Sequence, residues 1–161
     1  DWSAQKPVKF TKNEIDKETG KITREFTVPG TADVLRLFVN EGSAAGADIW
    51  VYDVNFEDVN SPGNNLQKDW LEKWTGNGNK ELVDADVTIF KPVDYTNKML
   101  HLVSREWGEH GTNISANNLR GKNMRLTYYF KGDGGNEDYD FRVWYIENND
   151  WSAQKSVKFT K

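Results

Sequence analysis

Residues 21–28 read KITREFTV, and this stretch decides the class of fold. Its hydrophobic side chains Ile22, Phe26 and Val28 fall on one face of an extended chain, whereas Lys, Thr and Glu side chains fall on the other. An alternation with a period of two residues predicts a β-strand with one buried face. We therefore expect a sheet that packs one side against a core.

Comparable runs recur along the chain, each bounded by Gly, Pro, Asn or Asp, which supply turn conformations. In DIWVYDV the alternation places Trp50, Tyr52 and Val54 on one face and Ile49 and Val51 on the other. In VLRLFV, Leu35, Leu37 and Val39 fall on one face. The further runs are DVTIF, MLHLV, MRLTYYF and YDFRVWYI. Short strands without a regular strand–helix alternation predict an all-β fold, namely an antiparallel β-sandwich of jelly-roll or immunoglobulin-like type.

One short helix is predicted near residues 64–75, in NNLQKDWLEKW, because Leu66, Trp70 and Trp74 are spaced four apart and form one apolar stripe. Both tryptophans can cover an open end of the core, or one of them can form a platform for a ligand. The residues expected to bound this helix are the cap, Asn64 or Asn65, and the terminator, Gly76.

Composition is typical of one folded domain with a solvated surface: 161 residues, 37% hydrophobic, 29% charged and 13% aromatic. The net charge of -4 and the scattered Lys and Arg residues argue against a nucleic-acid surface. The apolar runs are too short for membrane insertion. The absence of cysteine excludes disulfides, thiolate metal sites and a cysteine nucleophile.

The chain contains nearly the same twelve-residue sequence twice. The opening copy, residues 1–12, reads DWSAQKPVKFTK, and the closing copy, residues 150–161, reads DWSAQKSVKFTK. The two segments differ only where Pro7 stands in place of Ser156. Copies separated by the length of a domain predict a tandem array. In this interpretation residues 1–149 form a β-sandwich repeat unit, and residues 150–161 are the first strand of the following repeat. An engineered or accidental duplication is the remaining alternative.

Each copy is strand-like, with one apolar side that needs a sheet to cover it. The closing copy can complete the sandwich of its own chain, or it can join a neighbouring molecule by strand addition and so build head-to-tail filaments. Because proline has no N–H, the difference between Pro7 and Ser156 predicts different hydrogen-bonding environments for the two copies. The residues expected to mediate strand addition are Trp2, Val8, Phe10, Trp151, Val157 and Phe159.

Two acidic segments are candidates for Ca²⁺, a cation that prefers six to eight oxygen ligands. GDGGNEDYD is preferred because its acids are denser, and ADIWVYDVNFEDVN comes second. Neither segment matches the helix–loop–helix calcium pattern, so a solvated acidic turn is the alternative. The predicted ligands are Asp133, Asn136, Glu137, Asp138 and Asp140, with Asp48 and Asp53 from the second segment.

Catalysis is not predicted. The chain has no HExxH zinc motif, no G-x-S-x-G around a serine, and no glycine loop for phosphates. Exposed aromatic rings can stack on sugars, and Trp107, in the polar stretch SREWGEHGTN, is the candidate platform for a carbohydrate-binding module. An accessory domain of a secreted hydrolase is a third interpretation.

The stretch REFTVPGTADVLRLFVN followed by GADIWVYDVN, within residues 24–55, resembles the opening of bacterial pre-peptidase C-terminal domains. The resemblance implies a secreted jelly-roll domain that often binds calcium, with Asp48 and Asp53 as the corresponding acids. The segment NSPGNNLQKDWLEKW, after Asn55, departs from that family's pattern.

These observations together predict a non-catalytic structural module, located outside the cell or on its surface. Its expected partners are copies of itself or neighbouring repeats joined through the terminal strands, in a stalk, adhesin or fibre. A polysaccharide is the alternative partner, and Ca²⁺ is the candidate cofactor.

Overall fold

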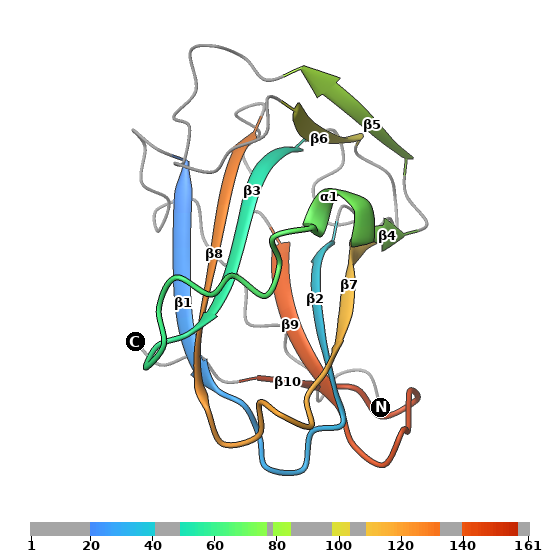
Figure 1. The fold of residues 1–161 in the computed structure, drawn as a ribbon. Helices are drawn as coiled ribbons and strands as arrows, with labels where there is room; N and C mark the ends of the chain where they lie inside the picture. Colours follow the sequence, from blue (N-terminus) through green and yellow to red (C-terminus); the bar gives the residue numbers. More distant parts are fainter. Residues whose placement is uncertain are drawn as a thin grey trace.

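The computed structural model describes residues 20–40, 49–76, 79–84, 98–103, 109–132 and 140–157. These residues form two antiparallel sheets that face each other, with one short helix beside β7 (Figure 1). The arrangement confirms the predicted all-β sandwich. Among the described residues, no helix has the length and hydrophobicity needed to cross a membrane.

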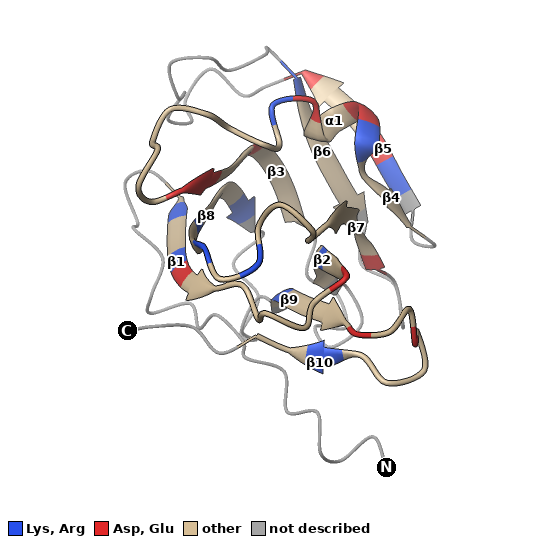
Figure 2. Ribbon diagram, turned by 60° about the horizontal axis from the view of Figure 1, so that its bottom comes forward, with Lys and Arg blue, Asp and Glu red and all other residues tan. Residues whose placement is uncertain are grey.

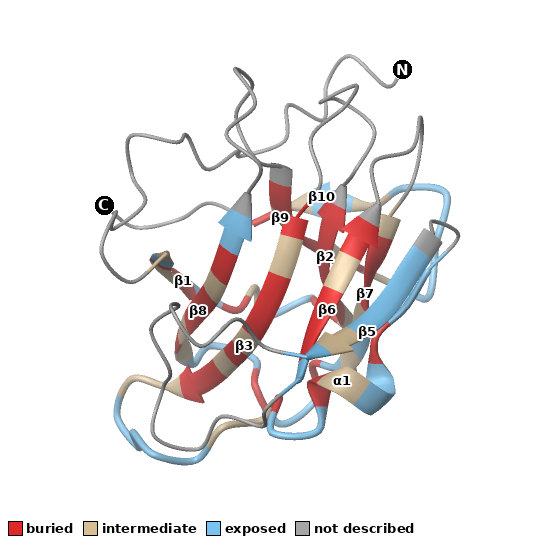
Figure 3. Cartoon of the chain, turned by 90° about the horizontal axis from the view of Figure 1, so that it is seen from above, coloured by how far each residue is buried: buried red, intermediate tan, exposed pale blue. Residues whose placement is uncertain are grey.

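The first sheet has the strand order β1-β8-β3-β6-β5, and every neighbouring pair in it is antiparallel. Figure 3 shows its margin strand, β5, as largely exposed. The strands are β1 (Lys21–Thr27), β3 (Ile49–Asp58), β5 (Asn79–Asp84), β6 (Lys98–Val103) and β8 (Asn123–Gly132).

The second sheet has the order β10-β9-β2-β7-β4 and is also antiparallel throughout. Its strands are β2 (Val34–Asn40), β4 (Thr75–Gly76), β7 (Glu109–Ser115), β9 (Asp140–Ile146) and β10 (Lys155–Ser156). The chain crosses between the sheets at each step from β1 to β5 and again at each step from β6 to β9. This interleaving favours the jelly-roll alternative over the immunoglobulin-like one.

The alternation in the sequence predicted the inward faces of β1 and β2 correctly. Ile22 and Phe26 of β1 belong to the core, and Leu35 and Leu37 of β2 are fully buried. The register pairs β2 with β7 on one side and with β9 on the other, so β2 lies in the middle of its sheet.

The faces predicted for β3 are wrong beyond Val51. The register shifts between Val51 and Asp53, which leaves Tyr52 as an extra residue in the strand. A bulge of this kind reverses which residues point inward. Val51 and Val54 are therefore both buried in the core, although the sequence alternation assigns them to opposite faces.

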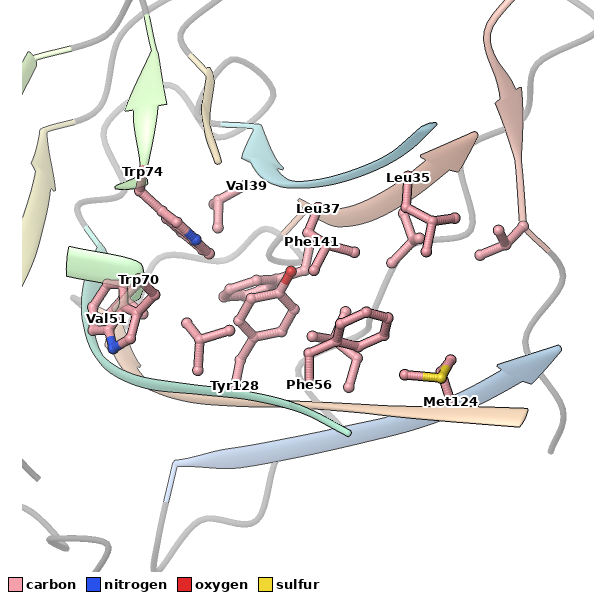
Figure 4. Packing of buried hydrophobic residues seen from close by; sticks show 14 of the residues in the cluster. Leu35, Leu37, Val39, Val51, Phe56, Trp70, Trp74, Met124, Tyr128 and Phe141 are labelled. Atoms are coloured by element: carbon pink, nitrogen blue, oxygen red, sulfur yellow. The ribbon is translucent and has the colours of Figure 1, made fainter. Parts of the chain in front are cut away.

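Aromatic rings fill the space between the sheets (Figure 4). The Tyr128 ring lies 4.5 Å from the ring of Phe141, centroid to centroid, and 6.1 Å from the ring of Trp74. Burial raises the pKa of the Tyr128 phenol. Each fully buried large apolar side chain contributes about 1.5–3 kcal/mol relative to an exposed one.

The helix is shorter than predicted. Helix α1 covers Trp70–Lys73, with Asp69 at its N-cap and no side-chain cap, and Trp74 already leaves the helix. Asn65 does not cap it. Its side chain instead accepts hydrogen bonds from the Phe56 and Gln67 amides (2.9 and 2.8 Å) and donates to the Val54 carbonyl (2.9 Å).

These hydrogen bonds explain why the helix starts late. Strand β6 pairs with β3 only at residues 49–51, so the rest of that side of β3 needs other partners for its backbone groups. Asn65 and the Leu66 amide, which donates to the Phe56 carbonyl at 2.7 Å, provide them. Asn65 and Leu66 are thus held against β3, and a turn at residues 66–69 leads into α1.

The tryptophans of this segment are not ligand platforms. Trp70 is 4% exposed and Trp74 is fully buried, and their rings meet edge to face at 5.4 Å. The Trp74 indole donates to Gln67 Oε1 at 3.3 Å. Both side chains therefore close the β core, which was the first of the two interpretations.

Acidic and basic side chains are mixed along the strands, as on β5 (Figure 2). Arg125 of β8 bonds Glu25 of the neighbouring β1 at 2.8 Å, and Lys98 of β6 bonds Asp84 of β5. Pairs of opposite charge across neighbouring strands are typical of a solvated sheet surface.

Candidate functional site

The closing copy of the repeated segment docks on its own chain. Lys155 pairs with Tyr145 and Ser156 pairs with Trp144, so β10 adds to the edge of the second sheet along β9 (Figure 1). The Val157 amide donates to the Val143 carbonyl at 3.1 Å and extends the same ladder. Val157 is 2% exposed and belongs to the core.

The ladder fixes the direction of each backbone N–H in β10. In an antiparallel pair, residues directly opposite alternate between pairs that exchange hydrogen bonds and pairs that do not. Val157 bonds to Val143, so Ser156 and Trp144 form a pair that does not. The Ser156 N–H therefore points away from β9.

Side-chain contacts hold the docked segment at two further places. The Lys155 ammonium bonds Glu147, whose carboxylate also accepts a hydrogen bond from the Thr31 hydroxyl. Arg36 Nη1, on β2, donates to Gln154 Oε1 at 2.9 Å. The hydrogen bonds from Lys155 and Thr31 lower the pKa of the Glu147 carboxyl, and the bond to Glu147 raises the pKa of Lys155.

The connection between β9 and β10, residues 147–154, is an ordered turn. Asp150 Oδ1 accepts from the Ser152 amide at 3.0 Å and from the Ser152 hydroxyl at 2.6 Å, and these bonds lower the pKa of the Asp150 carboxyl. The Asn149 amide donates to Asp33 Oδ2 at 3.2 Å. Trp151 lies in this turn and not in β10, and it is 46% exposed.

The other residues predicted to mediate strand addition cannot be placed. Trp2, Val8, Phe10 and Phe159 lie outside the described residues. For Val157 the structure gives a buried position in a paired segment, and for Trp151 an exposed one.

The predicted calcium ligands fall mostly outside the described residues, among them Asp48, Asp133, Asn136, Glu137 and Asp138. Asp140 is described as a backbone position in β9, opposite Asn40. Within the described ranges, no three His, Cys, Asp or Glu residues are grouped as they would be to hold a metal ion. Calcium binding stays a prediction.

Asp53 has a local role. Its Oδ1 accepts a hydrogen bond from the Val54 amide at 2.9 Å, directly after the bulge in β3. Together with burial, which has the larger effect, the Asp53 carboxylate raises the pKa of the facing Tyr129 phenol.

A hollow of about 390 Å³ lies beside Trp151, at the end of the sandwich where β2 begins and β7 ends. Sequence reasoning placed the candidate sugar platform at Trp107, which lies outside the described residues, and missed this hollow. The available signal was Trp151 itself, a large aromatic residue beside residues that favour turns. The residues that line the hollow are Asp33, Val34, Asn113, Ile114, Ser115, Asn117, Asn149 and Trp151.

A second hollow, of about 380 Å³, lies on the outer side of β2 and β7. Arg36 and Glu109 form an ion pair in its lining, and Phe38 lies opposite Gly111 in the strand pairing. A Cβ atom at Gly111 would lie 2.0 Å from the Leu37 carbonyl oxygen, so this position excludes any larger residue. The pairing of β2 with β7 thus depends on this glycine.

Comparison of the chain with protein-family models, with curated proteins and with solved structures finds no match. The resemblance of residues 24–55 to pre-peptidase C-terminal domains therefore stays a prediction.

Proposed function

We propose that the chain is a structural module that joins to copies of itself by strand addition at the edge of β9. The edge of β9 along which β10 pairs, at residues 143–145, is called the slot. The observation that carries the proposal is the docking of the closing copy in this slot, together with the near-identical copy at residues 1–12. Docking in the same chain completes the sandwich. Docking of the opening copy in a neighbour's slot would join two units head to tail.

The opening copy carries each side chain that the slot uses. Gln5 corresponds to Gln154, the partner of Arg36, and Lys6 corresponds to Lys155, the partner of Glu147. Val8 corresponds to Val157, which supplies the buried apolar contact. The slot should therefore accept either copy with the same set of contacts.

Pro7 is compatible with the slot, because its counterpart Ser156 directs its N–H away from β9. Proline at that position removes no bond to β9, and prolines are tolerated at such edge positions. The Ser156 hydroxyl is buried and has no hydrogen-bond partner among the described residues, so its loss also costs little. Proline on the outer edge would further block pairing with an unrelated strand.

An assembly of this kind suits a stalk, adhesin or fibre outside the cell or on its surface. In a tandem array, the segment between two units would close the sandwich of the unit before it. Residues 1–12 would then belong to the preceding unit, and residues 13–161 would be one complete repeat. No catalytic step is part of this proposal.

Two shortened chains test the proposal by sedimentation and thermal melting. Residues 13–161 keep the closing copy and are expected to stay monomeric. Residues 1–149 have an empty slot and a free opening copy, so they are expected to form oligomers whose size grows with concentration. The control is residues 1–149 with Val8→Asp, which should stay monomeric and melt at a lower temperature.

The proposal fails if residues 1–149 remain monomeric and melt at the temperature of the full chain. Such a result would show that the slot at β9 contributes nothing to stability and recruits no partner. Oligomers that persist with Val8→Asp would equally contradict it, because the apolar contact would then be irrelevant.

A further inference from the structure

The hollow beside Trp151 has one exposed aromatic wall. Trp151 and Leu82 are the large hydrophobic side chains that the structure exposes among the described residues, and Trp151 is 46% exposed. Leu82 belongs to β5 of the first sheet, whereas Trp151 lines the hollow. The indole therefore offers an apolar surface next to polar groups.

The turn that carries Trp151 is fixed before any ligand arrives. The Asp150–Ser152 hydrogen bonds close it on one side, and Gln154 Nε2 donates to the Trp151 carbonyl at 3.2 Å on the other. The bond from the Asn149 amide to Asp33 attaches the turn to the start of β2. A pre-ordered aromatic residue loses little conformational entropy on binding.

The lining of the hollow also includes neutral polar groups. Asn113 and Ser115 lie on the outer face of β7, and Asn117 follows in the connection to β8. All three are exposed, and the structure records no hydrogen bond for their side chains within the described residues. Each amide presents both a donor and acceptors, and the hydroxyl presents both as well.

The charge at the hollow is compensated internally. Asp33 Oδ1 accepts from Arg120 Nη2 at 2.5 Å, which pairs the acidic group of the lining with a cation. The hollow thus favours a neutral ligand with many hydroxyl groups over an anion or a cation. An aromatic face beside amide and hydroxyl groups matches a sugar, whose C–H face packs on the ring while its hydroxyls bond the amides.

The hollow adjoins the closing copy, because Trp151 belongs to that copy. It is at the end where residues 28–33, 116–122 and 147–154 connect strands (Figure 1). Strand β1 starts at the other end, where Lys21 pairs with Tyr129. Strand β10 runs back along β9 toward that end, because Lys155 lies opposite Tyr145 and Ser156 lies opposite Trp144.

We propose that this hollow binds a neutral hexopyranose unit of an oligosaccharide or polysaccharide, with Trp151 as the stacking platform and Asn113 and Asn117 as hydrogen-bonding groups. The site does not depend on assembly, because the docked closing copy of the same chain completes it. It gives the structural module a way to attach to glycans.

The test uses the full chain and a panel of neutral oligosaccharides: cellotetraose, xylotetraose, mannotetraose and chitotetraose. Isothermal titration calorimetry should detect binding of at least one of them. Trp151→Ala should weaken that binding about tenfold or more, because the C–H face of the sugar loses the ring on which it packs. Asn117→Ala should weaken it less. Leu82→Ala, which removes the other exposed large side chain, should leave it unchanged.

The melting temperature and the sedimentation of each variant show whether it is folded and which oligomeric state it has. Trp151→Ala is expected to stay folded and to keep the oligomeric state of the parent chain. The proposal is overturned if no sugar in the panel binds, or if Trp151→Ala binds as well as the parent. It is also overturned if Trp151→Ala changes the oligomeric state, because Trp151 would then belong to the joint between units.

Discussion

Ser156 and Val157 are neighbours in the closing copy, yet they play opposite parts in its docking. The Val157 N–H bonds to β9, and its side chain is buried in the core. The Ser156 N–H points away from β9, because Ser156 and Trp144 form a pair that does not exchange hydrogen bonds. A single residue step along the strand therefore separates a position that accepts proline from one that does not.

Exchanging these two residues for proline should separate their roles. Ser156→Pro is expected to change the free energy of unfolding by less than about 1 kcal/mol, because no ladder bond is lost and the unfolded chain is stiffened. Val157→Pro loses the bond to Val143 and the buried side chain, and should destabilise the chain by about 3 kcal/mol or more. Urea unfolding of both variants measures the difference.

Equal destabilisation by the two prolines would show that the Ser156 N–H bonds to a neighbour and that Pro7 could not use the slot. That outcome would remove the main argument for the two copies being interchangeable.

At the scale of elements, β5 and β7 pair regularly but were not predicted, because NKELVD and EHGTNIS contain few apolar residues. The run DVTIF, residues 86–90, lies outside the described residues. Alternation in the sequence predicted the strands β1, β2, β3, β6, β8 and β9. It succeeded for Ile22 and Phe26 in β1 because no bulge interrupts that strand. It failed in β3 because an extra residue at Tyr52 depends on how β8 pairs, which lies far away in the sequence. The helix was overestimated for a similar reason, since Asn65 bonds to β3 instead of capping α1.

The candidate site was only partly predictable. The repeated twelve-residue sequence identified the segment that docks, but its partner strand and its register come from tertiary structure. Whether the closing copy completes its own sandwich was left open by the sequence, and the burial of Val157 answers it for this chain. The hollow beside Trp151 combines β2, β7 and the connection before β10, which local patterns cannot bring together.

The connection to β10 should respond to acid through Glu147. Its carboxyl has a pKa below the ordinary value of 4.5, owing first to the hydrogen bond from Lys155 and then to the one from Thr31. A carboxyl with a lowered pKa stabilises the folded state above its unfolded pKa, and this stabilisation is lost as the pH falls through the folded pKa. The raised pKa of Lys155 keeps the ammonium charged up to pH values above 10.5.

Glu147→Gln should therefore melt at a lower temperature than the parent chain at pH 7, and the two melting curves should converge as the pH falls below about 4.5. Thermal melts between pH 7 and pH 3 measure the difference. Because the pair is exposed, 0.5 M NaCl should reduce the difference at pH 7. A difference that stays constant with pH would mean that the Glu147 charge does not help to hold β10.

For the whole molecule, the two copies compete for one slot per sandwich. The closing copy is connected to its own slot through the turn at residues 147–154, so its effective concentration there is high. The opening copy of another molecule can occupy that slot only when the closing copy is removed or weakened. The full chain is therefore expected to be mostly monomeric, while an array links its units through the continuous chain.

Weakening the closing copy by one substitution should shift this balance. Val157→Asp places a carboxylate where the side chain is 2% exposed, and burying a charge without a partner is strongly unfavourable. The closing copy should leave the slot, and Val8 of another molecule should enter it, so the variant should form oligomers that grow with concentration. Val8→Asp alone should behave as the parent chain, whereas the double variant Val8→Asp, Val157→Asp should be monomeric and the least stable of the four. Sedimentation velocity at several concentrations distinguishes these states. A Val157→Asp chain that remains monomeric with an unchanged melting temperature would contradict the proposal. It would show that the slot at β9 does not distinguish a buried valine from a charge and joins no units.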